Sequence, residues 1–213
     1  FGHRPNGLQK FSAGVAAVSG WVRKHGHTTS LILVENETTE EEFKAQLLEA
    51  DADVVGFTCM SFQWHFIQNI ARWVKEVRPE LPIVIGGYHP TGSPEQVIEY
   101  PNIDFLIRGE GEEAMTDLLA AIGTGGDVST IPNVWSRDRN DKTKIYKNEM
   151  RPLIADLDTL PDWDRDLFKM DELLAMSAKA SLYHARFHLP AWTGRGCPYK
   201  CAYCCNSELM AMY

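Results

Sequence analysis

The sequence predicts an α/β protein with a doubly wound parallel sheet, and three observations predict it. Helical patterns alternate with short apolar runs over residues 12–122. The apolar runs are continuous rather than alternating, which is typical of strands buried on both faces. The runs that end near residues 57, 85 and 107 are followed by loops that contain serine or glycine. We therefore expect helices on both sides of a parallel sheet.

The composition is that of a globular protein with a substantial core. Of the 213 residues, 44% are apolar and 23% are charged. These proportions exclude a disordered chain, collagen and a disulfide-rich miniprotein. The length suits one large domain, or one domain with a flanking piece.

The net charge of −8 argues against a nucleic acid or an anionic membrane as the main partner. Much of the acidity is local, because residues 35–53 contain eight acidic residues and one lysine. No apolar run is long enough for a membrane span, and no signal peptide opens the chain. These features predict a cytoplasmic protein.

The first half of the α/β region begins with a helix that Ser12 can cap and Gly26 can end. Residues 31–34 are a short apolar run of the strand type. A second helix follows from the capping box of Thr39 and Glu42. Much of the acidic segment is expected to be the solvated face of this helix. The expected buried stripe comprises Phe43, Leu47 and Leu48.

The second half contains predicted strands at 54–57, 83–85 and 103–107. A helix that opens at Ser61 is stopped by Pro79, and a last helix covers residues 113–122. The buried face of the Ser61 helix is expected to comprise Phe62, Phe66, Ile70, Val74 and Val77.

The flanking regions differ in character from this α/β pattern. Residues 1–11 are loop-like where such a domain normally starts with a strand, so we expect that an upstream strand is missing and that the chain is a fragment. After residue 126, the sequence predicts a small hairpin and then an ordered connector. The expected division is a ligand-binding domain at 1–126, hairpin and connector at 127–190, and a cysteine-containing segment at 191–213.

Four of the five cysteines fall within residues 197–205, which points to a metal rather than to disulfides. Cys197, Cys201 and Cys204 have the spacing C-x3-C-x2-C. A tight loop of this kind can place three thiolates on one iron–sulfur cube. The fourth iron then remains open to a small molecule.

The alternative is a structural zinc site that uses Cys201 and Cys204 as half of its ligands. His184 and His188 could complete it, although they precede the cysteines, in the reverse of the usual zinc-finger order. Cys205 is expected to be a packed thiol rather than a ligand.

Loop residues after three predicted strands form a second candidate site. In an open parallel sheet, ligands bind beyond the carboxyl ends of the strands. Residues 58–61, the pair Gly86-Gly87 and residues 109–111 should therefore share one edge. Glycine lets the backbone approach a bulky ligand, although each pair could also be a simple tight turn. Cys59, in the first of these loops, is expected to be buried.

The segment Arg195-Gly196-Cys197-x3-Cys201-x-Tyr203-Cys204 resembles the signature of radical S-adenosylmethionine (SAM) enzymes. The resemblance implies that Cys197, Cys201 and Cys204 hold a [4Fe–4S] cluster whose open iron is chelated by SAM. It also implies that Tyr203 lies against the adenine of SAM.

The upstream segments resemble the cobalamin-binding domain that precedes many radical SAM barrels. They are Asp53-Val54-Val55-Gly56-Phe57-Thr58, Gly86-Gly87-Tyr88-His89-Pro90, Arg108-Gly109-Glu110-Gly111-Glu112, Pro152-Leu153-Ile154 and Leu157-Asp158-Thr159-Leu160-Pro161. The implied fold is flavodoxin-like or Rossmann-like, followed by a linker and the start of a truncated (β/α) barrel. The implied cobalamin contacts are Thr58, Met60, Ser61, Gly86, Gly87, Tyr88, His89, Gly109, Glu110 and Gly111.

The chain departs from one cobalamin motif. Domains that ligate cobalt through histidine carry Asp-x-His-x-x-Gly after the first strand, and this string is absent here. The resemblance therefore implies cobalamin bound without a protein histidine below the cobalt. His3 lies in the corresponding region and is a candidate ligand, whereas His89 is expected to shape the rim.

The family implies radical methyl transfer to an unactivated carbon, with SAM and methylcobalamin as cofactors. The resemblance also implies a small-molecule substrate and an electron donor such as a flavodoxin or ferredoxin. Some members instead rearrange or cyclise a ring without methyl transfer. No catalytic side chain is assigned, and we expect the fragment alone to be inactive because a whole barrel takes about 200 residues or more.

Two rival functions belong to other classes. One is a non-catalytic, flavodoxin-like ligand-binding module whose cysteines hold zinc or act in redox chemistry. The other is a dinucleotide enzyme, which is disfavoured because no Gly-x-Gly-x-x-Gly follows a predicted strand.

Overall fold

A computed structural model describes residues 11–35, 37–138, 140–170, 191–192 and 194–213. These residues belong to two compact units. The described residues of the first unit lie within 11–33 and 157–195, and those of the second unit lie within 34–156 and 196–213. His3, His184 and His188 lie outside the described residues.

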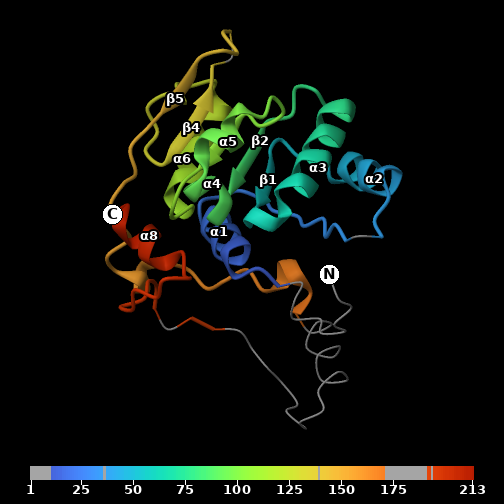
Figure 1. The fold of residues 1–213 in the computed structure, drawn as a ribbon. Coiled ribbons are helices and arrows are strands. Elements are labelled where there is room, and N and C mark those ends of the chain that lie inside the picture. Colours follow the sequence, from blue (N-terminus) through green and yellow to red (C-terminus); the bar gives the residue numbers. More distant parts are fainter. Residues whose placement is uncertain (1–10, 36, 139, 171–190, 193) are drawn as a thin grey trace. The chain divides into compact units, whose positions relative to one another are not determined.

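The second unit is built on a five-stranded sheet with the strand order β1-β2-β3-β4-β5 (Figure 1). Strands β1 (Val55–Thr58), β2 (Ile83–Gly86) and β3 (Phe105–Ile107) are parallel. Strands β4 (Val134–Arg137) and β5 (Ile145–Lys147) form an antiparallel hairpin that pairs with β3. The predicted α/β class is confirmed, and the predicted hairpin belongs to the same sheet as the parallel strands.

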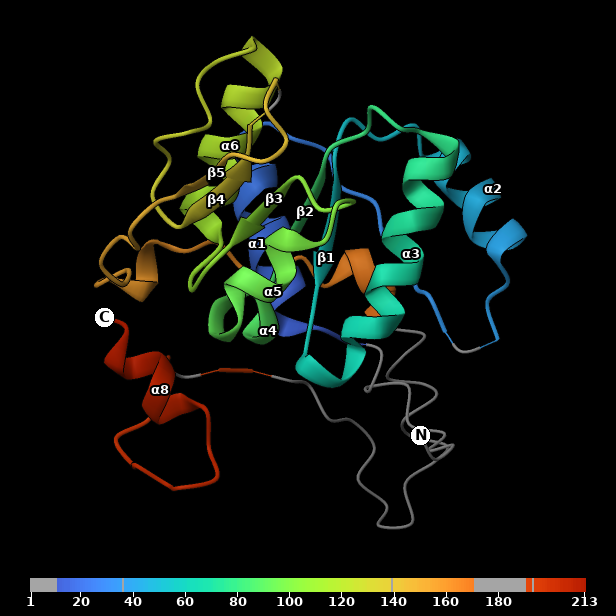
Figure 2. The same ribbon diagram turned by 45° about the horizontal axis from the view of Figure 1, so that its top comes forward.

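Three helices connect the parallel strands (Figure 2): α3 (Trp64–Val77) lies between β1 and β2, and α4 (Tyr88–Gly92) and α5 (Pro94–Glu99) lie between β2 and β3. Helix α2 (Glu40–Ala50) precedes β1, and α6 (Glu112–Thr124) leads from β3 to the antiparallel strand β4. Crossovers between parallel strands are right-handed, so the connections through α3 and through α4–α5 cover the same face of the sheet. The short helices α4 and α5 were not predicted, because no helical periodicity is readable over five or six residues.

The core is centred on β2 and β3, whose side chains are buried on both faces as predicted. On one face, Val84, Phe105 and Ile107 pack with Ala114 and Leu118 of α6. Strand β1 differs, because Gly56 and Thr58 are exposed. It is the edge strand of the described sheet, which explains why it is only half-buried.

The segment before α3 corrects one predicted buried face. Residues Ser61–Gln63 form a 3₁₀ turn, and α3 begins only at Trp64. Phe62 is therefore 65% exposed, whereas Trp64, which was not predicted to be buried, is 4% exposed. The change of helix type rotates the side chains before Trp64 away from the stripe that a continuous α-helix would have buried.

Helix α2 has the predicted capping box, in which the Glu42 backbone N–H donates to Thr39 Oγ1 and the Thr39 backbone N–H donates to the Glu42 carboxylate. Phe43 and Leu47 are buried, but Leu48 is 55% exposed. The buried face of α2 therefore contains two of the three residues that were predicted to form it. Glu41 and Glu42 are exposed, so the acidic segment is a solvated helix face, as expected.

The first unit contains α1 (Ala13–Lys24), with the predicted Ser12 cap and with Gly26 at φ +91° beyond its end. The strand predicted at 31–34 is wrong, because these residues adopt no strand. A strand needs a neighbour that takes up its backbone N–H and C=O groups. No described segment pairs with residues 31–34.

Part of the predicted connector packs on α1 within the first unit. The Asp164 backbone N–H donates to the Ala16 carbonyl over 2.9 Å, and Asp164 Oδ2 accepts from Ser19 Oγ over 2.6 Å. Arg23 also donates to this carboxylate. Burial alone would raise the pKa of Asp164, but these hydrogen bonds and one from the Leu167 N–H outweigh it and lower the pKa.

The second unit also contains the C-terminal helix α8 (Asn206–Ala211), which follows the cysteine segment. Among the described ranges, no helix combines the length and the apolar character needed to cross a membrane.

Candidate functional site

The loops after β1 and β2 are joined by backbone hydrogen bonds. Thr58 pairs with Gly86 in the parallel ladder, so the two strands end side by side. The Cys59 N–H donates to the Gly86 carbonyl over 2.9 Å, and the His89 N–H donates to the Cys59 carbonyl over 3.0 Å. The predicted convergence of these two loops at one edge is therefore present.

Gly87 makes this close approach of the two loops possible. Its φ is +101°, and a Cβ atom there would lie 3.0 Å from Cys59 N, Cys59 O and Thr58 Oγ1. Both the backbone conformation and the available space favour glycine. Gly87 is thus required by the structure of the rim, whatever binds there.

Thr91 links the loop after β2 to the loop after β3. Its hydroxyl donates to the Gly87 carbonyl over 2.8 Å and accepts from the Gly109 N–H over 3.0 Å. The residue is 3% exposed, so these bonds are shielded from water. Through Thr91, the three loops form one hydrogen-bonded edge, which we call the rim: residues 58–61, 86–91 and 109–111.

Two large apolar side chains of the rim and one that directly follows it are exposed. Met60 is 41% exposed, Phe62 is 65% exposed and Tyr88 is 44% exposed. They follow β1 and β2 directly and offer an apolar surface to a flat or bulky ligand. Phe62 was missed as a site residue because it was assigned to the buried face of a helix. Its position within four residues of a strand end was the signal that could have identified it.

His89 is buried within the rim, at 6% exposed. Its Nδ1 lies 3.3 Å from Ser61 Oγ, and its ring lies 5.3 Å from the ring of Trp64. Its Nε2 is buried and has no hydrogen-bond partner among the described residues. Burial lowers the pKa of His89, which favours a neutral imidazole. The orphaned nitrogen is a polar group that a bound ligand could satisfy.

The loop after β3 has an acidic character that limits what it can bind. Glu112 and Glu113 occupy the first turn of α6, where their charges interact with the helix dipole. The Glu110 carboxylate accepts from the Ile154 backbone N–H over 2.8 Å. This end of the rim therefore suits neutral or amide groups better than a phosphate.

The thiols of the cysteine segment are at least partly accessible. Cys201 and Cys205 are exposed, and Cys197 and Cys204 are partly exposed. No group of three metal-ligating side chains is gathered in the part of the chain that the structure describes. Cys205 is not the packed thiol that we predicted, because it lies at the exposed start of α8. Cys59 is buried as expected, and burial raises its pKa to about 11.

Tyr203 is 93% exposed, so its ring is free to stack against a ligand. The three thiols predicted as iron ligands lie within eight residues on one accessible loop. Their donor chemistry fits an iron–sulfur cluster.

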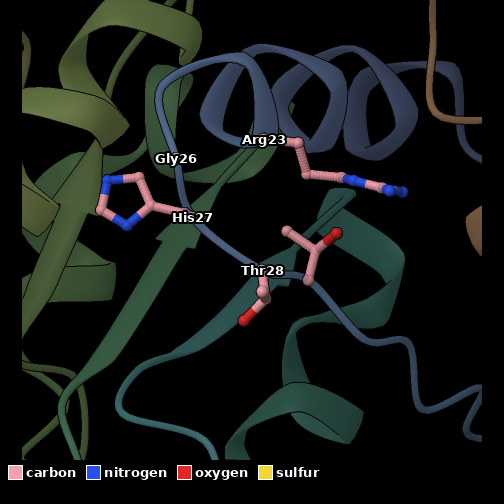
Figure 3. A pocket seen from close by; sticks show the side chains of 5 residues that line it. Arg23, Gly26, His27 and Thr28 are labelled. Carbon is pink, nitrogen blue, oxygen red and sulfur yellow. The ribbon is translucent and has the colours of Figure 1, made fainter.

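A shallow hollow of about 450 Å³ lies in the first unit, beyond the end of α1 (Figure 3). It is lined by Arg23, Gly26, His27, Thr28 and Thr29. The side chains of Arg23 and His27 extend in opposite directions, and Arg23 is paired with Asp164. The basic groups do not converge, so this hollow is a weaker site than the rim.

A mainly parallel sheet with glycine loops along its carboxyl edge defines an α/β ligand-binding domain. A family model described as the B12 binding domain matches residues 9–119 of the chain. Because this match covers more than half of the 213 residues, the chain belongs to the B12-binding domain family.

Two curated relatives cover most of this chain. The anaerobic magnesium-protoporphyrin IX monomethyl ester cyclase of Rubrivivax gelatinosus is 27% identical over 199 residues, which are 90% of this chain and 34% of the cyclase. The cobalamin-dependent radical SAM methyltransferase TokK of Streptomyces tokunonensis is 30% identical over 156 residues, which are 72% of this chain and 22% of TokK. The chain thus spans well under half of the length of these relatives.

A solved structure shares the fold. OxsB, described as a cobalamin-dependent S-adenosylmethionine radical enzyme with aqua-cobalamin and S-adenosylmethionine bound, superposes with a TM-score of 0.65 and 20% sequence identity. The match covers 78% of this chain and 23% of OxsB.

Proposed function

We propose that this chain is part of a cobalamin-dependent radical SAM enzyme. The observation that carries the proposal is the rim, in which three loops are hydrogen-bonded into one edge beside exposed apolar side chains. The cysteine spacing C-x3-C-x2-C in the same chain supports it, and so do the printed descriptions of the two relatives and of OxsB.

Cobalamin would bind on the rim. The glycine loops let the backbone approach the corrin edge, and Phe62 with Met60 and Tyr88 would cover an apolar part of the ring. The unpartnered His89 Nε2 offers one polar contact. The residues proposed to contact cobalamin are Thr58, Met60, Ser61, Phe62, Gly86, Gly87, Tyr88, His89, Gly109, Glu110 and Gly111.

The cysteine segment would bind the cluster and SAM. Cys197, Cys201 and Cys204 would each supply one thiolate, and Tyr203 would stack on the adenine. When bound, cobalamin, SAM and the cluster supply radical hydrogen abstraction and methyl delivery. The chain itself would hold these groups at a fixed separation and exclude water from the rim.

The division proposed from the sequence assigns residues 1–126 to the cobalamin-binding domain and residues 127–190 to the hairpin and connector. Residues 191–213 would then be the start of the radical SAM domain. A small-molecule substrate and an electron donor such as a flavodoxin or ferredoxin remain part of the proposal.

We favour methyl transfer, as in the relative TokK. Cyclisation of a ring substrate is the second candidate, because the Rubrivivax cyclase is similar over 90% of this chain. The two reactions differ in their SAM products.

The test uses the full-length protein, purified without oxygen and supplied with iron, sulfide and cobalamin. We expect bound iron and cobalt, and formation of 5′-deoxyadenosine from SAM after reduction. S-adenosylhomocysteine formed in the presence of reduced cobalamin would support methyl transfer. 5′-Deoxyadenosine without S-adenosylhomocysteine would support the cyclase reaction, and a colourless protein that binds only zinc would overturn both.

A further inference from the structure

The loop after β3 meets the end of the described chain at Tyr213. The Tyr213 hydroxyl accepts a hydrogen bond from the Glu110 backbone N–H over 3.1 Å. A Cβ atom at Gly109 would lie 1.8 Å from this oxygen and 2.9 Å from Tyr213 Cζ. The absent side chain of Gly109 therefore leaves the space that the phenol ring tip occupies.

Two further hydrogen bonds hold in place the loop that contacts Tyr213. The Gly109 N–H donates to Thr91 Oγ1, and the Glu110 carboxylate accepts from the Ile154 N–H. Gly109 has φ +69°, a conformation that other residues adopt only at a cost. The Glu110 N–H is thus presented to Tyr213 by a loop whose position is already determined.

Tyr213 is in turn part of the cysteine segment. The Ser207 hydroxyl donates to the Cys204 carbonyl over 3.1 Å, and the Leu209 N–H donates to the Cys205 carbonyl over 3.0 Å. Met210 Sδ lies 3.2 Å from the position of a Cβ atom on Gly196, just before Cys197. The cysteine loop, α8 and Tyr213 therefore form one continuous piece of structure.

We propose that Tyr213 is a positioning residue, which docks the cysteine segment onto the rim at Gly109 and Glu110. This inference rests on the proposed function, because it concerns the spacing between the cluster site and the cobalamin site. A displacement of about 1 Å between reacting groups can cost about 100-fold in rate. A contact that fixes the distance between the two sites would therefore preserve the rate of the reaction.

The contact is made by a neutral phenol. Burial raises the pKa of Tyr213, and its hydrogen bond to the Glu110 backbone only partly offsets this effect. The phenol therefore stays protonated at neutral pH. Tyr213 is 43% exposed, so burial of its ring contributes less to the stability of the docked segment than burial of a core tyrosine would. The hydroxyl contact with Glu110 specifies where α8 docks.

The first test concerns the contact itself and requires no cofactor. In the full-length apoprotein, Tyr213→Phe removes the acceptor of the Glu110 N–H. We expect hydrogen exchange at the Glu110 amide to accelerate about fivefold, the factor that corresponds to one ordinary hydrogen bond. Tyr100→Phe is the matched control, because the Tyr100 hydroxyl also bonds to the backbone, at the Gln68 carbonyl, and that bond involves no residue of the rim. Unchanged exchange at Glu110 in Tyr213→Phe would overturn the proposal.

The second test measures the spacing in the loaded full-length enzyme. The reduced cluster should accelerate the relaxation of the cob(II)alamin EPR signal, and we expect this effect to weaken in Tyr213→Phe and more strongly in Gly109→Ala. Tyr100→Phe should retain it. Faster exchange at Glu110 with unchanged relaxation would show that the contact exists without setting the spacing, which overturns the positioning role. A wild-type enzyme that binds no iron or cobalt would refute the proposed function, whereas the exchange test would still decide the contact.

Discussion

The rim and the cysteine loop are both candidate cofactor sites in the second unit, but they are organised in different ways. The rim is fixed by the protein itself, since Thr91 is buried and joins Gly87 to Gly109. The cysteine loop is not fixed in this manner. Its thiols are partly or fully exposed, and they are not gathered into a metal-ligating group in the described structure.

This difference follows from the physics of the two kinds of ligand. A large organic cofactor binds to a concave surface that is mostly formed in advance. A metal cluster supplies strong bonds of its own and organises its ligands as it binds. We therefore expect mutations in the rim to act through the protein structure, whereas mutations of the cysteines act through the metal alone.

The largest expected effect is the loss of the cluster in Cys197→Ala. With one of three thiolates missing, the reconstituted full-length protein should lose nearly all of its bound iron and the visible absorption of the cluster. Cobalamin uptake should be unchanged, because the hydrogen bonds that join the three loops of the rim involve no residue of the cysteine segment. Cys205→Ala is the matched control and should retain full iron content. If both variants lose iron equally, the ligand assignment is wrong.

The second effect is a structural failure of the rim in Gly87→Ala. The strained φ of +101° and the 3.0 Å contacts with Thr58 and Cys59 should lower the free energy of unfolding by about 3 kcal/mol. Cobalamin affinity should fall as well. Urea denaturation and an absorption titration measure the two effects. Gly92→Ala, where a Cβ meets nothing within 4 Å, should be neutral or stabilising, and an equal loss there would contradict this account.

A smaller effect is expected from Thr91→Val, which keeps the shape of the side chain and removes its hydroxyl. The Gly109 N–H would lose its buried acceptor, and the Gly87 carbonyl would lose one of its donors. We expect the free energy of unfolding to fall by about 2 kcal/mol. Chemical denaturation checks this value. The exposed Thr124 also donates to a backbone carbonyl, and Thr124→Val should change stability by less than about 0.5 kcal/mol. Equal effects in the two variants would show that Thr91 has no special role.

The smallest effect concerns the pH dependence of stability through His89. Burial lowers the pKa of His89 from its ordinary value of 6.5, so the unfolded chain binds the proton more readily. The contribution of neutral His89 to the free energy of unfolding is therefore complete above pH 6.5. It is lost as the pH falls through the pKa that His89 has in the folded state. His89→Gln should therefore flatten the fall in unfolding free energy that the wild type shows as the pH drops below 6.5. His65→Gln, at an exposed position, should leave the wild-type slope intact, and an unaltered slope in His89→Gln would refute the assignment.

Much of the architecture was readable from local patterns. The capping box at Thr39, the cap at Ser12 and the buried strands β2 and β3 follow from short stretches of sequence. Their physical causes are local as well: a side chain that satisfies a helix N–H, or a run of apolar residues buried on both sides.

The candidate site was predicted only in part. Glycines after strands mark the rim, and the order of the cysteines marks the second site. The missed features depend on neighbours that are distant in sequence. Phe62 is exposed because the chain turns through a 3₁₀ segment before α3, and residues 31–34 form no strand because a strand requires a partner.

The sequence by itself determined which residue types follow each strand and how the three thiols are spaced, since both are properties of consecutive residues. Only the tertiary structure decided that Thr91 bridges two loops, that Gly109 makes room for Tyr213, and that Met60, Phe62 and Tyr88 are exposed together at one edge. These contacts join residues between about four and about 100 positions apart. The contacts within the rim arise from the parallel packing of strands, which brings the carboxyl ends of separate segments to one edge of the sheet. The contact with Tyr213 arises from the packing of the segment that contains α8 against the loop after β3.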